Sequence, residues 1–203
     1  MRTPALCKSL SFKRLSLAMM AGACLSTSLP VMADRPNDSL FVGGSYGLQI
    51  RTSCDGATVC DRGTDAGKVF GGYRVTPGWA YEVTYFYLGT QHQAWDGAGG
   101  PGGLAVNDVK TTALGLWFRL DTELFGIMTN HLRGGLAGVA NKAYKDFTNG
   151  TSVVETQRRI IPYVGVGLSM LVAPQFRIQT GIDVLINTDR TNYLATVGGT
   201  FEF

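Results

Sequence analysis

The sequence is poor in the residues that most enzyme and metal sites use. Among its 203 positions it has two histidines and four cysteines, and only 16% of its residues are charged. No stretch after the first 33 residues offers the 18 consecutive apolar residues that a membrane-spanning helix needs. Helical periodicity is weak as well. We therefore expect no helical membrane anchor, no metal site, no cofactor and no catalytic residues.

Residues 1–33 have the pattern of a secretory signal peptide. Basic residues stand near the start, at Arg2, Lys8, Lys13 and Arg14. An apolar run follows at 15–25, and the small-residue motif at 31–33 fits cleavage before Asp34. The apolar run is too short to span a membrane. We expect a cleaved leader at 1–33 and a mature domain at 34–203. A lipoprotein-type cleavage before Cys24 is the alternative, although the usual leucine three residues earlier is missing.

Loss of the leader changes the sign of the net charge. The whole chain has a formal charge of +3, but residues 1–33 hold four of the 18 basic residues and none of the 15 acidic ones. The expected mature domain has 14 basic and 15 acidic residues, a formal charge of −1. No basic patch remains that would favour nucleic acid as a partner.

Two cysteines, Cys54 and Cys60, remain after the expected cleavage. They lie in the Gly/Asp/Thr-rich stretch SCDGATVCDRG. In an exported protein such a pair favours a disulfide that closes a small loop. A metal-binding pair is the alternative, but it lacks companion ligands, since His92 and His131 lie in other segments.

Period-two alternation recurs in segments of about ten residues that are separated by Gly, Pro, Asn and Asp. Eight such segments are expected to be strands: 40–50, 67–76, 79–90, 109–121, 131–143, 158–171, 175–187 and 192–203. Long polar connections at 51–66, 91–108 and 144–157 alternate with short ones. This alternation is typical of a meandering sheet whose two ends meet different environments.

The two faces of these segments differ in composition. One face is almost wholly apolar, whereas the other combines glycines and bulky residues with charges, notably Arg74, Glu82, Arg119, Arg133, Arg177 and Asp183. Such a mixture is typical of a narrow barrel interior, where buried charges must pair. The pattern predicts an all-β fold, an eight-stranded antiparallel up-and-down transmembrane β-barrel with apolar residues outside. Aromatic residues near strand ends would form interfacial girdles: Phe41, Trp79, Tyr81, Tyr87, Phe118, Phe176, Tyr193 and Phe201. Pro162 is expected at the outer rim or at a bulge.

Several runs carry a family resemblance. The stretches WAYEVTYFYLG at 79–89 and PYVGVGL at 162–168, with a last strand that ends in Phe, resemble the small OmpA-like and opacity-type outer-membrane barrels of the porin family. The resemblance implies a Gram-negative outer membrane, contact with its lipids and lipopolysaccharide, periplasmic turns and extracellular loops. It also implies insertion by the barrel assembly machinery, with Tyr193, Phe201 and Phe203 as the assembly signal.

The interior charges and the loops suggest what such a barrel does. The charge cluster forms either a gate or a plug of ion pairs, and the narrow lumen of eight strands favours the plug. We expect little or no pore activity, with a narrow channel as an alternative. Trp95, Tyr144 and Phe147 are expected on surface loops, where they would contact a host or matrix surface or lie among lipid headgroups. The predicted role is envelope integrity or adhesion, and the oligomeric state is left open.

Two further classes of protein, a lipid-modifying enzyme and a soluble ligand carrier, are alternatives to this interpretation. A lipid-modifying enzyme, similar to lipid A acyltransferases or deacylases, needs a nucleophile, a base and an orienting acid within reach. His92, expected in a surface loop, and His131, expected at a strand start, are more consistent with solvated or interfacial positions, so no enzyme is expected. A soluble lipocalin-like carrier would place its apolar residues inside, opposite to the assignment above.

Overall fold

The computed structural model describes residues 38–51, 56–61, 63–96, 99–187 and 191–203, which lie in one compact unit, Val31–Phe203. The expected leader at 1–33 and Cys54 lie outside these residues. Signal cleavage and a Cys54–Cys60 disulfide therefore stay predictions. Within the described residues, no helix is long and apolar enough to cross a membrane.

Eight long antiparallel strands and one short one make up the sheet. Their bounds are β1 Ser39–Arg51, β2 Val59–Cys60, β3 Gly63–Thr76, β4 Trp79–Ala94, β5 Leu104–Glu123, β6 Met128–Phe147, β7 Ser152–Ala173, β8 Phe176–Leu185 and β9 Asn192–Glu202. A single 3₁₀ turn, η2 (Pro101–Gly103), precedes β5. Each of the eight expected strands has a counterpart here, and β2 is an extra two-residue strand on the edge of β4.

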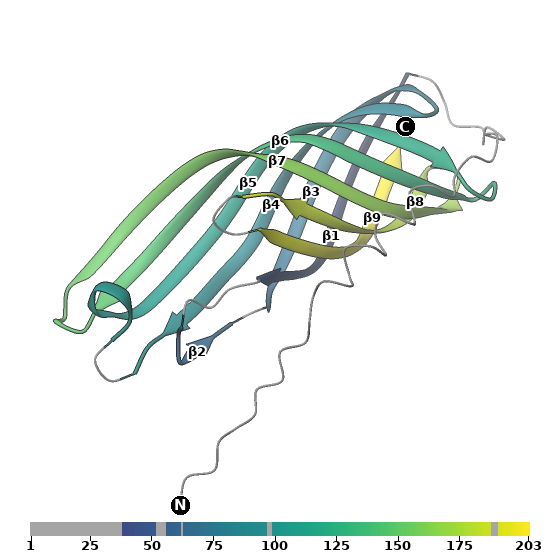
Figure 1. The fold of residues 1–203 in the computed structure, drawn as a ribbon. Coiled ribbons are helices and arrows are strands. Elements are labelled where there is room, and N and C mark those ends of the chain that lie inside the picture. Colours follow the sequence, from purple (N-terminus) through teal and green to yellow (C-terminus); the bar gives the residue numbers. More distant parts are fainter. Residues whose placement is uncertain (1–37, 52–55, 62, 97–98, 188–190) are drawn as a thin grey trace, which may run out of the picture. The chain divides into compact units, whose positions relative to one another are not determined.

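The sheet closes into a ring. Each long strand pairs with the next along the chain, β4 pairs with β5, and β9 returns to pair with β1. At this closure the backbone N–H groups of Leu40 and Phe203 each donate to the other residue's carbonyl, at 3.0 and 2.9 Å. Over the part of the wall that all eight long strands share, a closed ring leaves no unpaired edge. The predicted eight-stranded antiparallel up-and-down barrel is confirmed (Figure 1).

The two faces of the wall are sorted as the alternation predicts. In β5, Leu116 on the outside is 61% exposed, whereas Trp117 beside it points inward and is 1% exposed. The exposed apolar residues form a belt around the barrel, from Leu40 and Val42 in β1 to Ile178 and Ile182 in β8. This apolar belt is the surface that a membrane would cover.

One residue expected in the aromatic girdles is on the other face. Phe41 is buried inside the barrel, where its ring lies 5.7 Å from the guanidinium of Arg74 and 5.4 Å from that of Arg119. A carbon added at Gly72 would meet this ring at 2.4 Å, so the glycine makes the space that Phe41 occupies. The prediction used the position of Phe41 near a strand end and did not use its face.

The wall is much taller on one side. Strands β5, β6 and β7 have 20, 20 and 22 residues, whereas β8 and β9 have 10 and 11. We call the end with the short turns and Phe203 the turn end, and the opposite end the loop end. At the loop end the long strands reach past β8 and β9 (Figure 1). The polar connection expected at 144–157 is therefore mostly strand, and half of the one expected at 91–108 is strand. Alternation does not reveal them, because both faces of this extension are polar.

Pro162 lies where the ladder between β7 and β8 stops. It pairs with Leu136 of β6 without a register shift, so it does not form a bulge. Its carbonyl accepts from the N–H of Ile186 at 3.0 Å, one residue past the end of β8. In an antiparallel pair the N–H and C=O of one residue point to the same neighbour. The N–H that proline lacks would thus point to the end of β8, where few ladder bonds remain to be made.

Candidate functional site

A continuous chain of ion pairs crosses the interior near the turn end. Five cations and four carboxylates alternate along it, and they come from β3, β4, β5, β6, β8 and β9. The order of contacts is Lys68, Asp183, Arg133, Glu82, Arg119, Asp121, Arg74, Glu202 and Arg177. We call these nine residues the ion-pair chain.

Glu82 of β4 lies at the middle of the ion-pair chain. Its Oε1 is 3.2 Å from Nε of Arg133, and its Oε2 is 3.5 Å from Nη1 of Arg119. Arg133 also reaches Asp183, with Nη1 and Oδ1 3.7 Å apart, and Lys68 forms an ion pair with the same carboxylate. All five of these side chains are at most 2% exposed.

The half of the chain closer to the turn end is held by two carboxylates. Asp121 Oδ1 and Oδ2 lie 2.8 Å from Nε of Arg119 and 2.6 Å from Nη1 of Arg74. Glu202 in the last strand lies 2.5 Å from Nε of Arg74 and 3.7 Å from Nε of Arg177. Because Glu202 is next to the closing β1–β9 pair, the ion-pair chain also ties the ring closure to β3 and β8.

This arrangement meets the main condition for burying charge. An isolated charge in a low-dielectric interior is very unfavourable, whereas a paired and hydrogen-bonded one is tolerated. Removing one partner of a buried pair typically costs about 3–5 kcal/mol, because the other charge is left without compensation. The ion-pair chain is therefore a set of mutually dependent residues.

The structure places all six charges predicted for the interior inside the barrel. Five of them, Glu82, Arg119, Arg133, Asp183 and Arg74, follow one another through direct contacts or through Asp121. Arg177 joins them through Glu202, which it contacts at the end of the ion-pair chain.

Sequence reasoning missed Lys68 and Asp121. Each lies two residues from a recognised inward residue, Phe70 and Arg119, so the period of two would have placed both inside. Sequence reasoning missed them because they lie at or next to the ends of the expected strands, Lys68 in 67–76 and Asp121 in 109–121.

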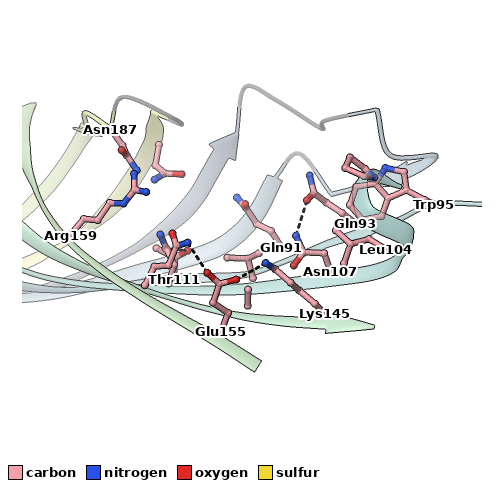
Figure 2. A pocket seen from close by; sticks show the side chains of 16 residues that line it. Gln91, Gln93, Trp95, Leu104, Asn107, Thr111, Lys145, Glu155, Arg159 and Asn187 are labelled. Atoms are coloured by element: carbon pink, nitrogen blue, oxygen red, sulfur yellow. Dashed lines mark hydrogen bonds and ion pairs between the residues drawn. The ribbon is translucent and has the colours of Figure 1, made fainter. Parts of the chain in front are cut away.

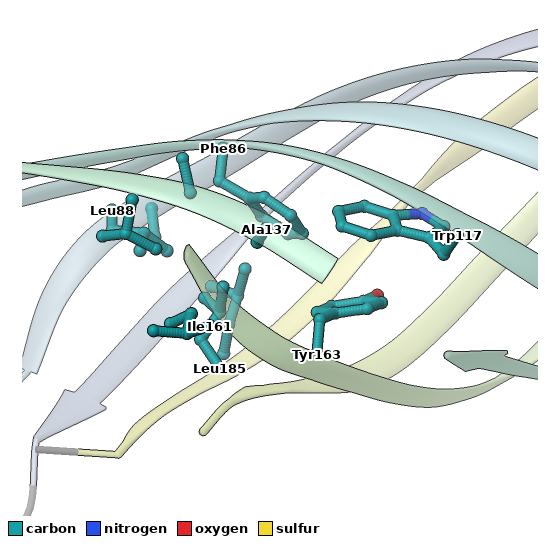
Figure 3. Close-up of a cluster of buried hydrophobic side chains, with 11 residues drawn as sticks. Phe86, Leu88, Trp117, Ala137, Ile161, Tyr163 and Leu185 are labelled. Carbon is teal, nitrogen blue, oxygen red and sulfur yellow. The ribbon is translucent and has the colours of Figure 1, made fainter. Parts of the chain in front are cut away.

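An aromatic layer covers the ion-pair chain on its loop-end side. The rings of Trp117 and Tyr163 stack with centroids 4.0 Å apart, and Phe86 packs 5.5 Å from Trp117 (Figure 3). Trp117 Nε1 donates to Glu82 Oε1 at 3.0 Å, and the Tyr163 hydroxyl donates to Asp183. The polar atoms of this layer thus join the charges below, and its apolar surface faces Leu88, Ile161, Leu185 and Leu194 above.

A glycine makes room for this layer. A carbon added at Gly115 would lie 1.7 Å from the Trp117 ring, closer than atoms can approach. Gly115 is the inward-pointing residue of β5 on the loop-end side of Trp117. The indole therefore leans over the backbone of its own strand, toward the loop end, and occupies the space that a side chain at 115 would take.

Beyond the aromatic layer, at the loop end, is a polar cavity of about 520 Å³. It is lined from β4, β5, β6 and β7, with Asn187 and Asn192 at the ends of β8 and β9 (Figure 2). Amide side chains predominate in its lining, including Gln91, Gln93, Asn107, Asn141 and Gln157. We call this space the loop-end cavity.

An exposed ion pair stands in the wall of the loop-end cavity. Lys145 Nζ of β6 lies 2.5 Å from Glu155 Oε2 of β7, and Gln157 Nε2 donates to Glu155 Oε1 at 2.9 Å. These bonds, above all the one from Lys145, hold the pKa of Glu155 below its ordinary value. The two charges of the pair compensate each other.

The three aromatic residues predicted on loops have different surroundings. Trp95 directly follows β4 and lines the loop-end cavity, with its ring against Gly100. Tyr144 lies within β6 on the outer face, with Lys142 Nζ 4.9 Å from its ring centroid. Phe147 is the last residue of β6. Tyr144 and Phe147 are thus strand residues, and the loop expected at 144–157 is reduced to 148–151.

Neither histidine occupies its expected position. His92 is within β4 and its Nδ1 lies 2.6 Å from Asp108 Oδ1 of β5. His131 of β6 is fully buried and Gly167 packs against it, so the solvated or interfacial placement was wrong. The two lie in opposite halves of the barrel and do not form one site. Within the described ranges no cluster of three His, Cys, Asp or Glu side chains is arranged to hold a metal ion.

The three residues of the predicted assembly signal lie on the outer face. Tyr193 and Phe201 are 37% and 43% exposed, and Phe203 is 60% exposed. The rings of Phe201 and Phe203 are 5.9 Å apart. They belong to the apolar belt. Their role in assembly stays a prediction.

Comparisons with known proteins agree with this architecture. A family model described as the OmpA-like transmembrane domain matches residues 37–195. A search of curated protein sequences gives no match. Among solved structures, the chain resembles OprG from Pseudomonas aeruginosa, with a TM-score of 0.62 and 10% identity over 85% of this chain and 99% of that one.

Two other barrels are similar at comparable level. Ail, the attachment invasion locus protein of Yersinia pestis, solved with the heparin analogue sucrose octasulfate, gives a TM-score of 0.57 and 14% identity over 83% of this chain and all of that one. Neisserial surface protein A gives 0.54 and 17% identity over 81% and 97%. Identities this low show a shared fold alone. The matched family model covers most of the sequence, and the chain therefore belongs to the OmpA-like transmembrane domain family of outer-membrane β-barrels.

Proposed function

We propose that the protein is a non-conducting outer-membrane barrel that presents a binding surface to the outside of the cell. In this proposal the ion-pair chain and the aromatic layer close the lumen, and the tall wall of β4–β7 carries the interaction surface. The loop end faces outward and the turn end faces the periplasm. The barrel contacts lipid and lipopolysaccharide through its apolar belt, after insertion by the barrel assembly machinery.

The observation that carries this proposal is the filling of the interior between the turn end and the loop-end cavity. In β5 the inward residues run from Asn107–Thr111 at the cavity, through Ala113–Trp117 in the aromatic layer, to Arg119 and Asp121 in the ion-pair chain. The same order holds in β4, from Gln93 to Glu82. Eight strands enclose a space that side chains can fill, and here large buried ones occupy successive levels of it.

The likeness to surface proteins supports the second half of the proposal. Ail is an attachment invasion protein, and NspA is a surface protein. In our barrel the tall wall places Trp95 and the loop-end cavity beyond the apolar belt, where contact with another surface is sterically open. An enzyme is not favoured, because the two histidines lie apart and no observation assigns a nucleophile to either.

Planar-bilayer recording of the purified protein tests the closed lumen. We expect small or no steady conductance, because an ion would have to displace the buried Glu82–Arg133 and Asp183–Lys68 contacts. Large, steady conductance of porin size would contradict the closed barrel. The refolded state of the same sample is checked by the shift in gel migration between unboiled and boiled protein.

Binding by whole cells tests the surface role. Deletion of 94–104 would leave Gln93 and Asn107, a cross-strand pair, joined by a two-residue turn, so the barrel wall can still close. We expect cells with this deletion to lose attachment to host-cell or matrix surfaces. The matched control is Gln175→Leu in the turn between β7 and β8, which should attach normally. Unchanged attachment after the deletion would contradict the adhesive role.

A further inference from the structure

We propose that the loop-end cavity is a carbohydrate-binding site that takes a weakly charged or uncharged sugar chain. This inference rests on the proposed function, since it names what the outward-facing surface recognises. Three features carry it: buried polar atoms without partners among the described residues, a lining rich in amides beside an indole ring, and a buried apolar layer between the cavity and the ion-pair chain.

The cavity lining holds hydrogen-bonding groups that the protein itself does not satisfy. Gln91 and Gln93 are 3% and 1% exposed, and within the part of the chain that the structure describes neither side-chain Nε2 has a hydrogen-bond acceptor. The same holds for the donor Nε1 of Trp95 and for the acceptor Oδ1 of Asn107. Buried polar groups are nearly always paired in native proteins. Four such atoms around one cavity indicate that a polar ligand completes them.

The mixture of these groups matches hydroxyls better than ions. A hydroxyl donates one hydrogen bond and accepts others, and so it can pair with amide N–H and amide C=O groups alike. An anion would require concentrated positive charge, whereas the lining holds only two cations, Lys145 and Arg159, and Lys145 is paired with the carboxylate of Glu155 at 2.5 Å. A ligand with many hydroxyls and little charge therefore fits this lining.

The cavity also offers apolar surface to the ligand. Trp95, Leu104 and Val109 stand among the amides. A sugar ring has C–H groups on its faces and hydroxyls around its edge, so it needs apolar and hydrogen-bonding partners at the same time. The volume of about 520 Å³ falls within the range of about 300–1,000 Å³ that is typical of small-ligand sites.

The buried apolar layer between the cavity and the ion-pair chain makes the cavity a binding site and not a transport path. Leu88, Ile161, Leu185 and Leu194 are at most 5% exposed and belong to the same buried cluster as Trp117 and Tyr163. A polar sugar that entered from the loop end would have to pass this cluster and then the ion-pair chain. We therefore expect reversible binding from the loop end without uptake.

Sugar chains of this chemistry have two sources at an outer membrane. One is the neutral outer part of the core oligosaccharide of the cell's own lipopolysaccharide, and the other is glycan on a foreign surface. The test uses the purified full chain in detergent micelles, with binding measured by isothermal titration calorimetry. The probes are lipid-free core oligosaccharide from which phosphate and acidic sugars have been removed, maltohexaose, an N-acetylglucosamine hexamer and a highly sulfated heparin oligosaccharide.

We expect at least one of the three weakly charged probes to bind with little dependence on salt concentration. Binding of core oligosaccharide alone assigns the site to the cell's own lipopolysaccharide, and binding of a neutral hexamer assigns it to foreign glycan. Binding of none of the three would overturn the inference. So would salt-sensitive binding of the sulfated probe alone, because it would identify an anion site.

The decisive variant is Gln91→Leu. It removes a donor that has no acceptor among the described residues, so the stability of the barrel should be unchanged or higher, whereas affinity for the sugar should fall about tenfold. Gln175→Leu makes the same change in the turn between β7 and β8 and should bind as the natural chain does. Equal affinity in Gln91→Leu and Gln175→Leu would overturn the assignment.

A second variant covers the case in which Gln91→Leu fails to fold, as judged by heat-modifiable gel migration. Trp95→Phe keeps an aromatic ring against Gly100 but loses the indole N–H, and it should also weaken binding severalfold. Failure of this inference is distinct from failure of the proposed function. Cells that still attach to surfaces while the purified protein binds no sugar contradict only the carbohydrate site, whereas large conductance contradicts the closed barrel.

Discussion

The interior near the turn end and the interior at the loop end are formed by the same strands but contain different kinds of polar side chain. In the ion-pair chain, nine charged side chains are buried and each contacts a charge of opposite sign. In the loop-end cavity, uncharged amides predominate and several of their polar atoms lack a partner. The aromatic layer separates the two regions.

This difference indicates which region stabilises the barrel and which is available for binding. A buried charge is tolerated when it is paired, as every member of the ion-pair chain is. Within the described residues, four atoms of that chain still make no hydrogen bond: Glu82 Oε2, Arg119 Nη1, Arg133 Nε and Arg177 Nη1. The unsatisfied atoms at the loop end differ in that they belong to residues lining a cavity. The contrast can be tested by making the same chemical change in both regions.

The largest effect is expected from Glu82→Gln. The change preserves the shape of the side chain but removes the negative charge between Arg119 and Arg133, which leaves two buried guanidinium groups without their common partner. The free energy of unfolding should fall by about 3–5 kcal/mol. Urea unfolding in detergent micelles, followed by heat-modifiable gel migration, measures the loss.

The matched control is Glu155→Gln at the loop end. Its partner Lys145 is 30% exposed and remains hydrated when the carboxylate is lost, so we expect no measurable change in stability. Equal destabilisation by the two variants would show that the ion-pair chain has no special role, and the comparison between the two regions would not stand.

A smaller effect is expected from Gly115→Ala, which tests the aromatic layer. The added methyl would overlap the Trp117 ring, so the ring must move and the stack on Tyr163 must loosen. Overpacking of this kind costs about 1–3 kcal/mol. Near-ultraviolet circular dichroism should report the altered aromatic packing. Gly134→Ala, where an added carbon meets open space, should leave both the spectrum and the stability unchanged.

The smallest effect concerns the pKa of Glu155. Lys145→Met removes the hydrogen bond that lowers this pKa, which should therefore rise toward its ordinary value. Because the pKa is depressed in the folded state, the pair stabilises the protein above the ordinary pKa, and this contribution is lost as the pH falls through the folded value. Titration of carbon-13-labelled glutamate by NMR measures the shift. An unchanged pKa would mean that Lys145 does not hold the carboxylate.

The sequence was most informative where membrane and lumen impose opposite demands on the two faces. In β7, Val164 and Val166 face out and Tyr163 and Gly165 face in, so the period of two fixes both the strand and its orientation. The charges Glu82 and Arg133 could be assigned to the interior for the same reason, because no charged residue would be placed against lipid.

The same reasoning fails where the two faces of a strand no longer meet different environments. Beyond the apolar belt, water reaches both faces of β4–β7, and residues such as Gln157 and Thr156 alternate without any contrast in polarity. The sequence therefore predicts connections at 91–108 and 144–157, where the structure has strand at 91–94, 104–108, 144–147 and 152–157. The sequence also does not predict which residues pair within the ion-pair chain, because the contact between Arg177 and Glu202 depends on the stagger of β8 against β9.

Pro162 helps to set how far the barrel wall extends at the loop end. Because Pro162 has no amide hydrogen, the β7–β8 ladder could continue past it only if one backbone carbonyl of β8 received no hydrogen bond. The pairing of β8 with β7 stops at Leu185. The neighbouring hairpin of β6 and β7 is not limited in this way and extends further. The loop-end rim is therefore high at β6 and β7 and low at β8, so that one missing backbone donor makes the wall around the loop-end cavity asymmetric.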